Sequence, residues 1–156
     1  MMLILGLDPG SLSFGIGIVK KEKGHFSYVH SETIKLKGRD FFERMGELWE
    51  RLNDLTAAFP VDQAAMEEGF LGKNIRSLSQ LSMVRGLALA ALLNRGLALS
   101  MYAPRQVKLA MTGYGNADKE QVAKMAALVL NVGKKKIGLD ESDALAVAYC
   151  HGVSAR

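Results

Sequence analysis

The stretch that decides the fold is "LILGLDPGSLSFGIGIVKKEKGHFSYVHSETIK", residues 3–35. Its apolar runs, at 3–8, 13–20 and 25–35, are separated by the segments "DPGS" and "KKEKG". Runs of this length bounded by Gly, Pro and charged residues are typical of consecutive β-strands. The first run ends on a single carboxylate, Asp8, just before Pro9 and Gly10 turn the chain. That charge needs a structural or functional reason.

The rest of the chain alternates between helical and strand patterns. Apolar residues recur every three or four positions over 40–59, which predicts an amphipathic helix with its aromatic side chains in the core. Further on, the sequence predicts strands at 61–68 and 97–103 and helices at 75–96, 104–111, 117–130 and 140–152. Three hairpin-linked strands followed by alternating elements favour an α/β fold of the ribonuclease H-like type, a mixed five-stranded sheet flanked by helices. We expect one domain spanning residues 1–156.

The composition is that of an ordinary globular domain. The chain has 156 residues, 49% of them hydrophobic and 23% charged, which is enough apolar material for one core. A single cysteine, Cys150, excludes an internal disulfide, and no apolar run is long enough to cross a bilayer. The start has no basic segment ahead of its apolar run, as a secretion signal would. We therefore expect a cytoplasmic protein with no membrane partner.

Acidic residues recur where predicted elements end or begin. Glu67 and Glu68 end the strand at 61–68, and strand alternation alone does not choose between them. Asp140 and Asp143 are predicted at the N-cap and third position of the last helix. Simpler interpretations exist: Asp8 can cap its own turn, and acids are favoured at the positive end of a helix dipole.

Together, these carboxylates can form a metal site at one edge of the sheet. Such oxygen ligands select Mg²⁺ or Mn²⁺ over zinc, and the sequence has no Cys/His set with zinc spacing. One or two such ions suit phosphoryl chemistry, in which one activates water and a second stabilises the leaving oxygen. The 20 Lys and Arg residues already outnumber the 16 Asp and Glu residues, and the excess becomes eight if four acids bind metal. This balance favours a polyanionic substrate.

Four motifs carry a family resemblance. They are "GLDPGSLSFGIGIV" at 6–19, "MEEGFLGKNIRSL" at 66–78 followed by Arg85-Gly86, "YAPRQVKLAMTGYGNADKEQV" at 102–122, and "DESDALAVAYCH" at 140–151. In this order the chain resembles the RuvC family of bacterial Holliday junction resolvases. The resemblance implies a homodimeric, Mg²⁺-dependent endonuclease, with Mn²⁺ as a substitute, that cuts four-way DNA junctions symmetrically during recombination and repair. It also implies the RuvA and RuvB branch-migration proteins as partners.

The same resemblance assigns roles to individual residues. Its strand-end motif selects Glu67 over Glu68, and the metal ligands it implies are Asp8, Glu67, Asp140 and Asp143. Lys108 and Lys119 match lysines beside the active site, and each has ordinary exposed lysine as the alternative. The resemblance further implies DNA contacts by residues on the loop after Glu67 and near the active site: Phe70, Lys73, Asn74, Arg76 and Arg105. Phe70 has a core position as its alternative.

Arg85 and the helix around it match the segment through which two subunits pair. One residue departs from the family pattern, and the role of one loop stays open. Glu141 stands where the family has a small residue, so it could compete with Asp140 or Asp143 for metal. The basic loop "GKKK" at 133–136 is either a DNA contact or a solvated loop.

Three other functions remain open from sequence. An actin-like or sugar-kinase-like ATPase can carry a similar first hairpin, although that fold normally repeats its domain. A catalytically silent DNA-binding member is disfavoured because all four acids are present. A related ribonuclease H-like nuclease could act on another branched or RNA-containing substrate.

Overall fold

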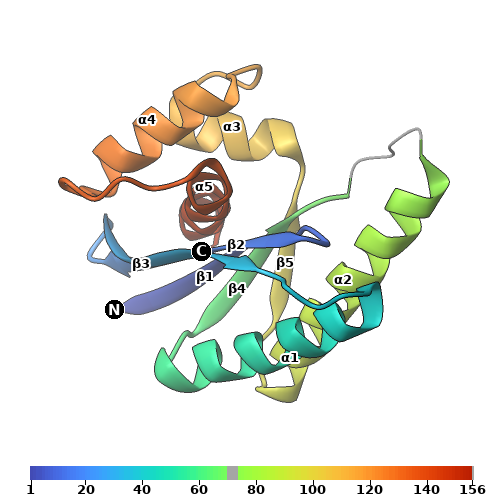
Figure 1. The fold of residues 1–156 in the computed structure, drawn as a ribbon. Helices are drawn as coiled ribbons and strands as arrows, with labels where there is room; N and C mark the ends of the chain where they lie inside the picture. The colour runs from blue at the N-terminus through green and yellow to red at the C-terminus, as the bar shows by residue number, and fades with distance from the viewer. Residues whose placement is uncertain (70–73, 156) are drawn as a thin grey trace.

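A five-stranded mixed sheet forms the centre of the molecule. The computed structural model describes residues 1–69 and 74–155. The strands lie in the order β3-β2-β1-β4-β5, with β1, β2 and β3 antiparallel and β4 and β5 parallel to β1. Figure 1 shows the sheet with helices on both faces. The strands are β1 Met2–Asp8, β2 Ser13–Glu22, β3 His25–Lys35, β4 Gln63–Glu67 and β5 Leu99–Tyr102.

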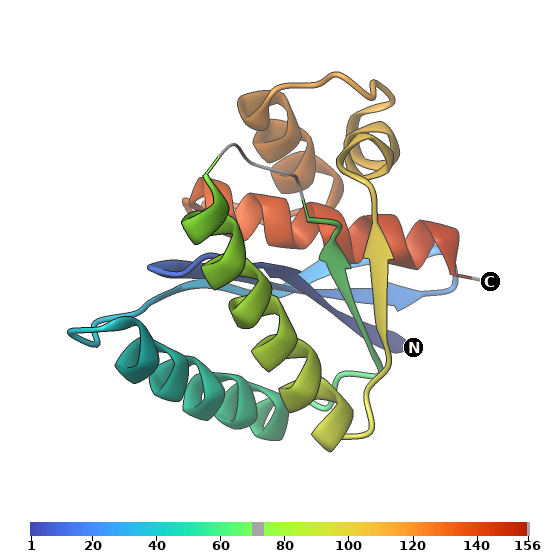
Figure 2. The same cartoon turned by 90° about the vertical axis from the view of Figure 1, so that its right-hand side faces the viewer.

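The helices form unequal layers on the two faces. Figure 2 shows α1 and α2 below the sheet and α5 directly above it, with α3 and α4 stacked farther out on α5. No helix in the described part of the chain is both long and apolar enough to cross a membrane. The helices are α1 Phe41–Ala58, α2 Ile75–Asn94, α3 Pro104–Thr112, α4 Lys119–Val129 and α5 Leu139–Ser154.

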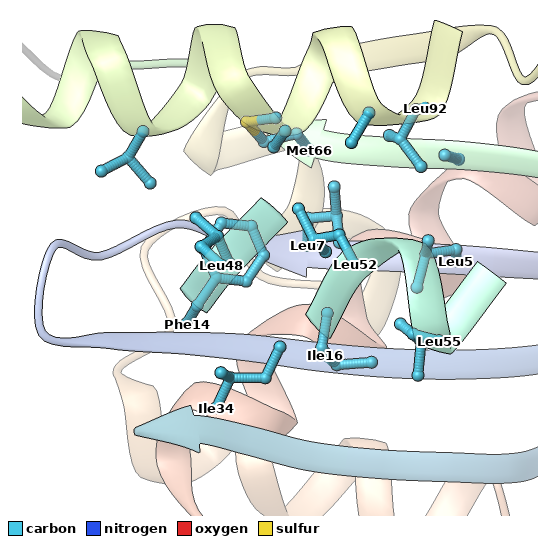
Figure 3. Packing of buried hydrophobic residues seen from close by; sticks show 14 of the residues in the cluster. Leu5, Leu7, Phe14, Ile16, Ile34, Leu48, Leu52, Leu55, Met66 and Leu92 are labelled. Carbon is cyan, nitrogen blue, oxygen red and sulfur yellow. The ribbon is translucent and has the colours of Figure 1, made fainter. Parts of the chain in front are cut away.

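The largest core cluster fills the space between the sheet and the α1–α2 layer. Figure 3 shows Phe14 and Leu7 from the strands packed against Leu48 and Leu52 of α1. All four side chains are fully buried. Because strand residues alternate between faces, other strand side chains, among them Ile4, Val19 and Ala65, point toward α5 and pack with it in two further apolar clusters.

Helix α5 lies unusually close to the sheet because glycines face it. A Cβ added to Gly17 would lie 2.5 Å from the backbone nitrogen of Leu145, and one added to Gly6 would collide with the carbonyl oxygen of Ala144. Only glycine allows this approach of helix backbone to strand backbone. The first turns of α5 are thereby held against the end of β1, where Asp8 lies.

The predicted order and type of all ten elements are confirmed, but the start of the last helix is not. The N-cap of α5 is Gly138, so Asp140 and Asp143 are its second and fifth residues rather than its N-cap and third. The Gly138 carbonyl accepts a hydrogen bond of 3.0 Å from the Ser142 N–H, so helical bonding already starts before Asp140. The helix therefore begins two residues earlier, and Asp143 lies two residues farther into the helix than expected.

The expectation that the aromatic residues of the first helix lie in the core is wrong for two of them. Phe42 is 79% exposed and Trp49 is 39% exposed, whereas Leu48 and Leu52 on the same helix are fully buried. The buried stripe of α1 is aliphatic because the helix is rotated to place those leucines over the sheet. Spacing shows that a helix has an apolar stripe but does not fix its edges.

Candidate active site

Asp8 ends β1, the central strand, and its carboxylate lies near other acidic side chains. Burial, followed by the charges of the nearby Asp143, Asp140 and Glu67, raises the pKa of Asp8 from 3.8 to about 7, and Lys119 opposes the rise. In residues 1–69 and 74–155, no backbone N–H of the Pro9–Gly10 turn donates a hydrogen bond to the Asp8 carboxylate, as a turn cap would require. The turn-cap interpretation of Asp8 is therefore not supported by the geometry.

Glu67 ends β4, the strand beside β1. The parallel register pairs Leu7 with Met66, so Asp8 and Glu67 stand next to each other at the carboxyl edge of the sheet. Burial raises the pKa of Glu67, and Asp143 adds to the shift, while Lys108, Arg85 and Lys119 lower it. Its neighbour Glu68 is exposed. The ambiguity between the two glutamates is thus resolved in geometry: Glu67 is the one directed toward Asp8.

Asp143 completes the group from the helix layer. Its Oδ2 lies 3.3 Å from the Lys119 ammonium. Burial raises the pKa of Asp143 while Lys119 lowers it, and Asp143 in turn raises the pKa of Lys119. One acidic group in this site is therefore already paired with a cation supplied by the protein.

Asp140 lies one turn earlier on α5, at the margin of the site. Its Oδ2 accepts a hydrogen bond of 3.0 Å from the Ser13 hydroxyl at the start of β2. Its charge still acts on Asp8 and Asp143, because it contributes to raising the pKa of both. Sequence analysis missed Ser13, because nothing in the sequence says that α5 docks beside the first residue of β2.

Glu141 points away from these acids. Its Oε2 accepts a hydrogen bond of 2.5 Å from the Ser31 hydroxyl on β3 and lies 3.9 Å from the Lys135 ammonium. Its Oε1 accepts the Gly138 N–H at 3.2 Å. With both oxygens engaged there, Glu141 is a brace between α5 and β3 and is not directed at the group around Asp8.

A pocket of about 190 Å³ gathers the main candidates. Its basic side chains come from α3 and from the first residue of α4, whose start is fixed by Asp118 and Gln121 capping one another at 2.8 and 2.9 Å. Figure 2 shows the ends of β4 and β5 pointing toward these two helices. The pocket is lined by Asp8, Glu67, Pro104, Val107, Lys108, Lys119, Val122 and Asp143.

Comparison with known proteins identifies this arrangement. The sequence model described as "Crossover junction endodeoxyribonuclease RuvC" matches residues 4–151. The chain belongs to the RuvC family. Proteins named crossover junction endodeoxyribonuclease RuvC from Christiangramia forsetii and Colwellia psychrerythraea are 39% and 40% identical to it. These matches cover 96% and 99% of this chain and 78% and 89% of those proteins.

Solved structures of RuvC proteins confirm the ribonuclease H-like fold. Thermus thermophilus RuvC in complex with Holliday junction substrate superposes with a TM-score of 0.91 at 30% identity, covering 100% of this chain and 96% of that one. Thermus thermophilus RuvC alone gives a TM-score of 0.86 at 30% identity, covering 99% of this chain and 95% of that one. The single RuvC match over almost the whole chain does not favour the ATPase alternative.

Membership of this nuclease family implies a divalent metal. Among the described residues, no three acidic, histidine or cysteine side chains converge closely enough to enclose an ion as they stand. The chemistry of the donors nevertheless fits one. Asp8, Glu67 and Asp143 line one pocket, and burial raises the pKa of each. A hard cation would relieve this repulsion through the oxygen ligands that it prefers.

The residues expected to contact DNA occupy different places relative to this pocket. Lys108 lines it, whereas the Arg105 side chain lies over Gly115 in the loop between α3 and α4. Asn74 caps α2 by accepting the N–H groups of Arg76 and Ser77 at 3.1 and 3.2 Å. Arg76 is exposed on the first turn of the same helix. Phe70 and Lys73 lie outside the described residues.

In the basic loop 133–136, one lysine is bound to the protein itself. Lys135 donates to the Tyr28 hydroxyl at 2.6 Å and to the Ser31 carbonyl at 3.0 Å. Lys134 and Lys136 are exposed. The expected choice between a DNA contact and a solvated loop therefore concerns these two lysines.

Arg85, expected at a subunit contact, makes a contact within its own chain. From the middle of α2 its guanidinium donates to the backbone carbonyl of Glu67. The side chain is partly buried, and it reaches its own strand β4 rather than projecting from the helix surface. The outer surface of α2 carries other apolar residues.

Proposed function

We propose that this chain is a Holliday junction resolvase that hydrolyses phosphodiester bonds in two strands of a four-way DNA junction during recombination and repair. The observation that carries the proposal is the meeting of Asp8, Glu67 and Asp143 with Lys108 and Lys119 in one pocket. Buried acids beside lysines suit a site where metal and phosphate bind together. Membership of the RuvC family supports the junction as substrate.

In this proposal Asp8, Glu67 and Asp143, with Asp140 at the margin, hold one or two Mg²⁺ ions, for which Mn²⁺ substitutes. When bound, such an ion would lower the pKa of an attacking water and stabilise charge at the leaving oxygen. The carboxylates orient this charge at the carboxyl edge of the sheet, where β1 and β4 fix Asp8 and Glu67 side by side. Glycines of the sheet hold α5, and with it Asp143, against them.

The two lysines bind the DNA backbone at the reacting phosphate. Lys108 and Lys119 stand on different helices at one pocket, so they can approach the non-bridging oxygens of one phosphate from two directions. The ion pair between Lys119 and Asp143, at 3.3 Å, holds that ammonium at the site before substrate arrives. Phe70, Lys73, Asn74, Arg76 and Arg105 extend the DNA contact in this proposal, with Lys134 and Lys136 as outlying contacts.

We propose a homodimer paired through α2. Met83, Leu89 and Leu93 are 54%, 39% and 57% exposed on this helix. Gly86 has open space where a side chain would be, and it lies in the same stripe because residues three or four apart share a helix face. Apolar side chains around an open glycine allow close helix contact, and a two-fold dimer presents two active sites to a junction of matching symmetry. RuvA, RuvB and a cytoplasmic location complete the proposal by family resemblance.

The test is cleavage of synthetic DNA by the purified protein. With Mg²⁺ we expect nicks in opposed strands of a four-way junction, while linear duplex of the same sequence stays largely intact. Asp8→Asn should abolish cutting and keep junction binding, because it removes a ligand charge without changing shape. Asp54→Asn, at an exposed position on α1, is the matched control and should cut normally.

Each outcome distinguishes among the alternatives. Equal cutting of junction and duplex would remove the resolvase assignment and keep the nuclease. Preferential cutting of another branched or RNA-containing substrate would reassign the substrate. Normal cutting by Asp8→Asn would contradict the metal-binding role.

A further inference from the structure

The guanidinium of Arg85 bridges helix α2 and the end of β4. Its Nη2 donates to the carbonyl oxygen of Glu67, the last residue of the strand. This carbonyl belongs to the residue whose carboxylate faces Asp8 in the pocket. A hydrogen bond to the backbone at this point restrains the direction in which the Glu67 side chain leaves the strand.

Gly69 supplies a second, independent observation. A Cβ added to Gly69 would collide with Nη1 of Arg85 and lie 3.3 Å from the Arg85 Cζ. The guanidinium therefore lies directly over the backbone two residues beyond Glu67. Glycine at 69 leaves the space that the guanidinium occupies.

The opposite edge of the same segment is held by β5. The N–H of Glu68 donates to the Tyr102 carbonyl at 2.8 Å, and Glu67 is paired in register with Tyr102. The end of β4 is thus hydrogen-bonded to β5 through Glu68 and to α2 through the Glu67 carbonyl. Among the described residues, the other element that holds this segment on that side of β1 is the edge strand β5, which has four residues.

The charge of Arg85 also suits this position. Burial lowers the pKa of its guanidinium, while Glu67 and Asp8 act to raise it. The same cation opposes the rise in the pKa of the Glu67 carboxyl that burial causes. Arg85 therefore offsets part of the repulsion among the acids while its hydrogen bond goes to the backbone.

We infer that Arg85 is a positioning residue that fixes the end of β4, and so directs the Glu67 carboxylate toward Asp8. This inference rests on the proposed function in one respect, the role of Glu67 as a metal ligand. It assigns to Arg85 a contact within its own chain in place of the subunit contact expected from sequence. It also couples α2, the helix proposed for dimer pairing, to the active site.

The experiment compares four single variants: Arg85→Gln, Arg85→Lys, Gly69→Ala and, as the matched control, Arg95→Gln. Arg95 is an exposed arginine at the other end of α2, where it donates to the Asn53 carbonyl at 3.1 Å. Gly69→Ala is the sharpest variant, because it leaves Arg85 present and displaces only the far end of a flexible side chain. It should therefore fold normally while moving the guanidinium.

Three measurements are made on each folded variant. They are the Mn²⁺ dissociation constant by electron paramagnetic resonance, the hydrogen exchange rate of the Glu68 amide without metal, and kcat and KM for junction cleavage. We expect Arg85→Gln and Gly69→Ala each to weaken Mn²⁺ binding by about tenfold or more, as loss of a residue supporting a ligand does. Exchange at Glu68 should accelerate by a similar factor, and kcat should fall more than KM rises.

Additivity and rescue separate positioning from general structural damage. The double variant should lose no more Mn²⁺ affinity than the worse single variant, because both changes break one contact. Arg85→Lys should recover part of the affinity, and Arg95→Gln should match the wild type. Unchanged Mn²⁺ binding in folded Arg85→Gln or Gly69→Ala, or fully additive losses, would overturn the inference.

Three further results show which part of the inference has failed. If Glu67→Gln leaves Mn²⁺ affinity unchanged, the ligand role in the proposed function is wrong. If Glu67→Gln weakens binding but Arg85→Gln does not, the positioning role alone is wrong. Dissociation of an Arg85→Gln dimer in sedimentation, with Mn²⁺ affinity intact, would return Arg85 to the subunit contact and overturn the inference.

Discussion

At the scale of single residues, Asp8 contributes to the active site but lowers the stability of the metal-free folded protein. Its pKa rises from 3.8 to about 7, chiefly through burial and then through the neighbouring acids. The folded protein therefore binds this proton more tightly than the unfolded chain does. The free energy of unfolding should fall as the pH rises from about 4 to about 7 and then level off, because the unfolded chain releases the proton first.

We accordingly expect Asp8→Asn to stabilise the metal-free protein at pH 8.5. An amide has the shape of a protonated carboxyl without its titration, so the gain is a large part of what the full shift corresponds to, roughly 2 to 4 kcal/mol at about 1.4 kcal/mol per pKa unit. At pH 4, where the folded wild type keeps its proton, the difference should be small. Urea unfolding in EDTA at both pH values measures this.

Added Mn²⁺ supplies the control for this prediction. It should stabilise the wild type at pH 8.5 more than it stabilises Asp8→Asn, because an ion that binds only the folded state adds to its stability. A variant less stable than the wild type in EDTA at pH 8.5 would contradict the high pKa of Asp8.

The residue scale is also where sequence reasoning reaches its limit. Asp8 could be singled out because a charge in an apolar strand end is unusual. Glu67 and Glu68 could not be separated by alternation, since the exact strand end decides which one faces the site. The contact between Arg85 and the Glu67 carbonyl depends on the rotation of α2 over the sheet, and no local pattern encodes that rotation.

At the scale of elements, the N-terminal part of α5 shows how neighbouring acids take different roles. On a helix, Asp140 and Asp143 share a face, and Glu141 is turned about 100° from Asp140. Glu141 therefore meets Ser31 and Lys135 on the β3 side, while Asp143 meets Lys119. Sequence analysis located the helix but placed its start two residues late, because Gly138 is a weaker start signal than aspartate.

The brace formed by Glu141 gives the element-scale prediction. Glu141→Ala should lower the free energy of unfolding by about 1 to 3 kcal/mol, since the Ser31 hydroxyl and the Gly138 N–H both lose their acceptor. Glu141→Gln should cost less because its amide oxygen can keep one of these bonds. Urea unfolding of the variants, with Glu50→Ala on the exposed face of α1 as control, measures both effects.

Metal binding tests the remaining part of the Glu141 interpretation. A brace that does not ligate metal should leave the Mn²⁺ dissociation constant of Glu141→Gln within about threefold of the wild type. A loss as large as that of Asp8→Asn would make Glu141 a ligand after all.

At the scale of the whole molecule, the two helical layers have different tasks. The α5 layer packs close to the sheet because glycines face it, and it carries Asp140 and Asp143. The α1–α2 layer closes the larger core and leaves apolar side chains of α2 outside. This division could be expected from the order of elements, since right-handed crossovers constrain which face each helix covers. The exposed apolar stripe of α2 could be recognised only from the structure, because periodicity does not say which apolar residues lack a neighbour.

If that stripe pairs two subunits, a single charge in it should separate them. Leu93 is 57% exposed, so Leu93→Glu should fold normally as a monomer, whereas burying its carboxylate in a dimer contact should weaken association about tenfold or more. Leu128→Glu on α4, at a position 76% exposed, is the matched control. Sedimentation equilibrium measures association, and junction cleavage should change from paired cuts to single nicks. An unchanged dimer in Leu93→Glu would place the subunit contact on another face, because a buried unpaired charge cannot be tolerated where the helices meet.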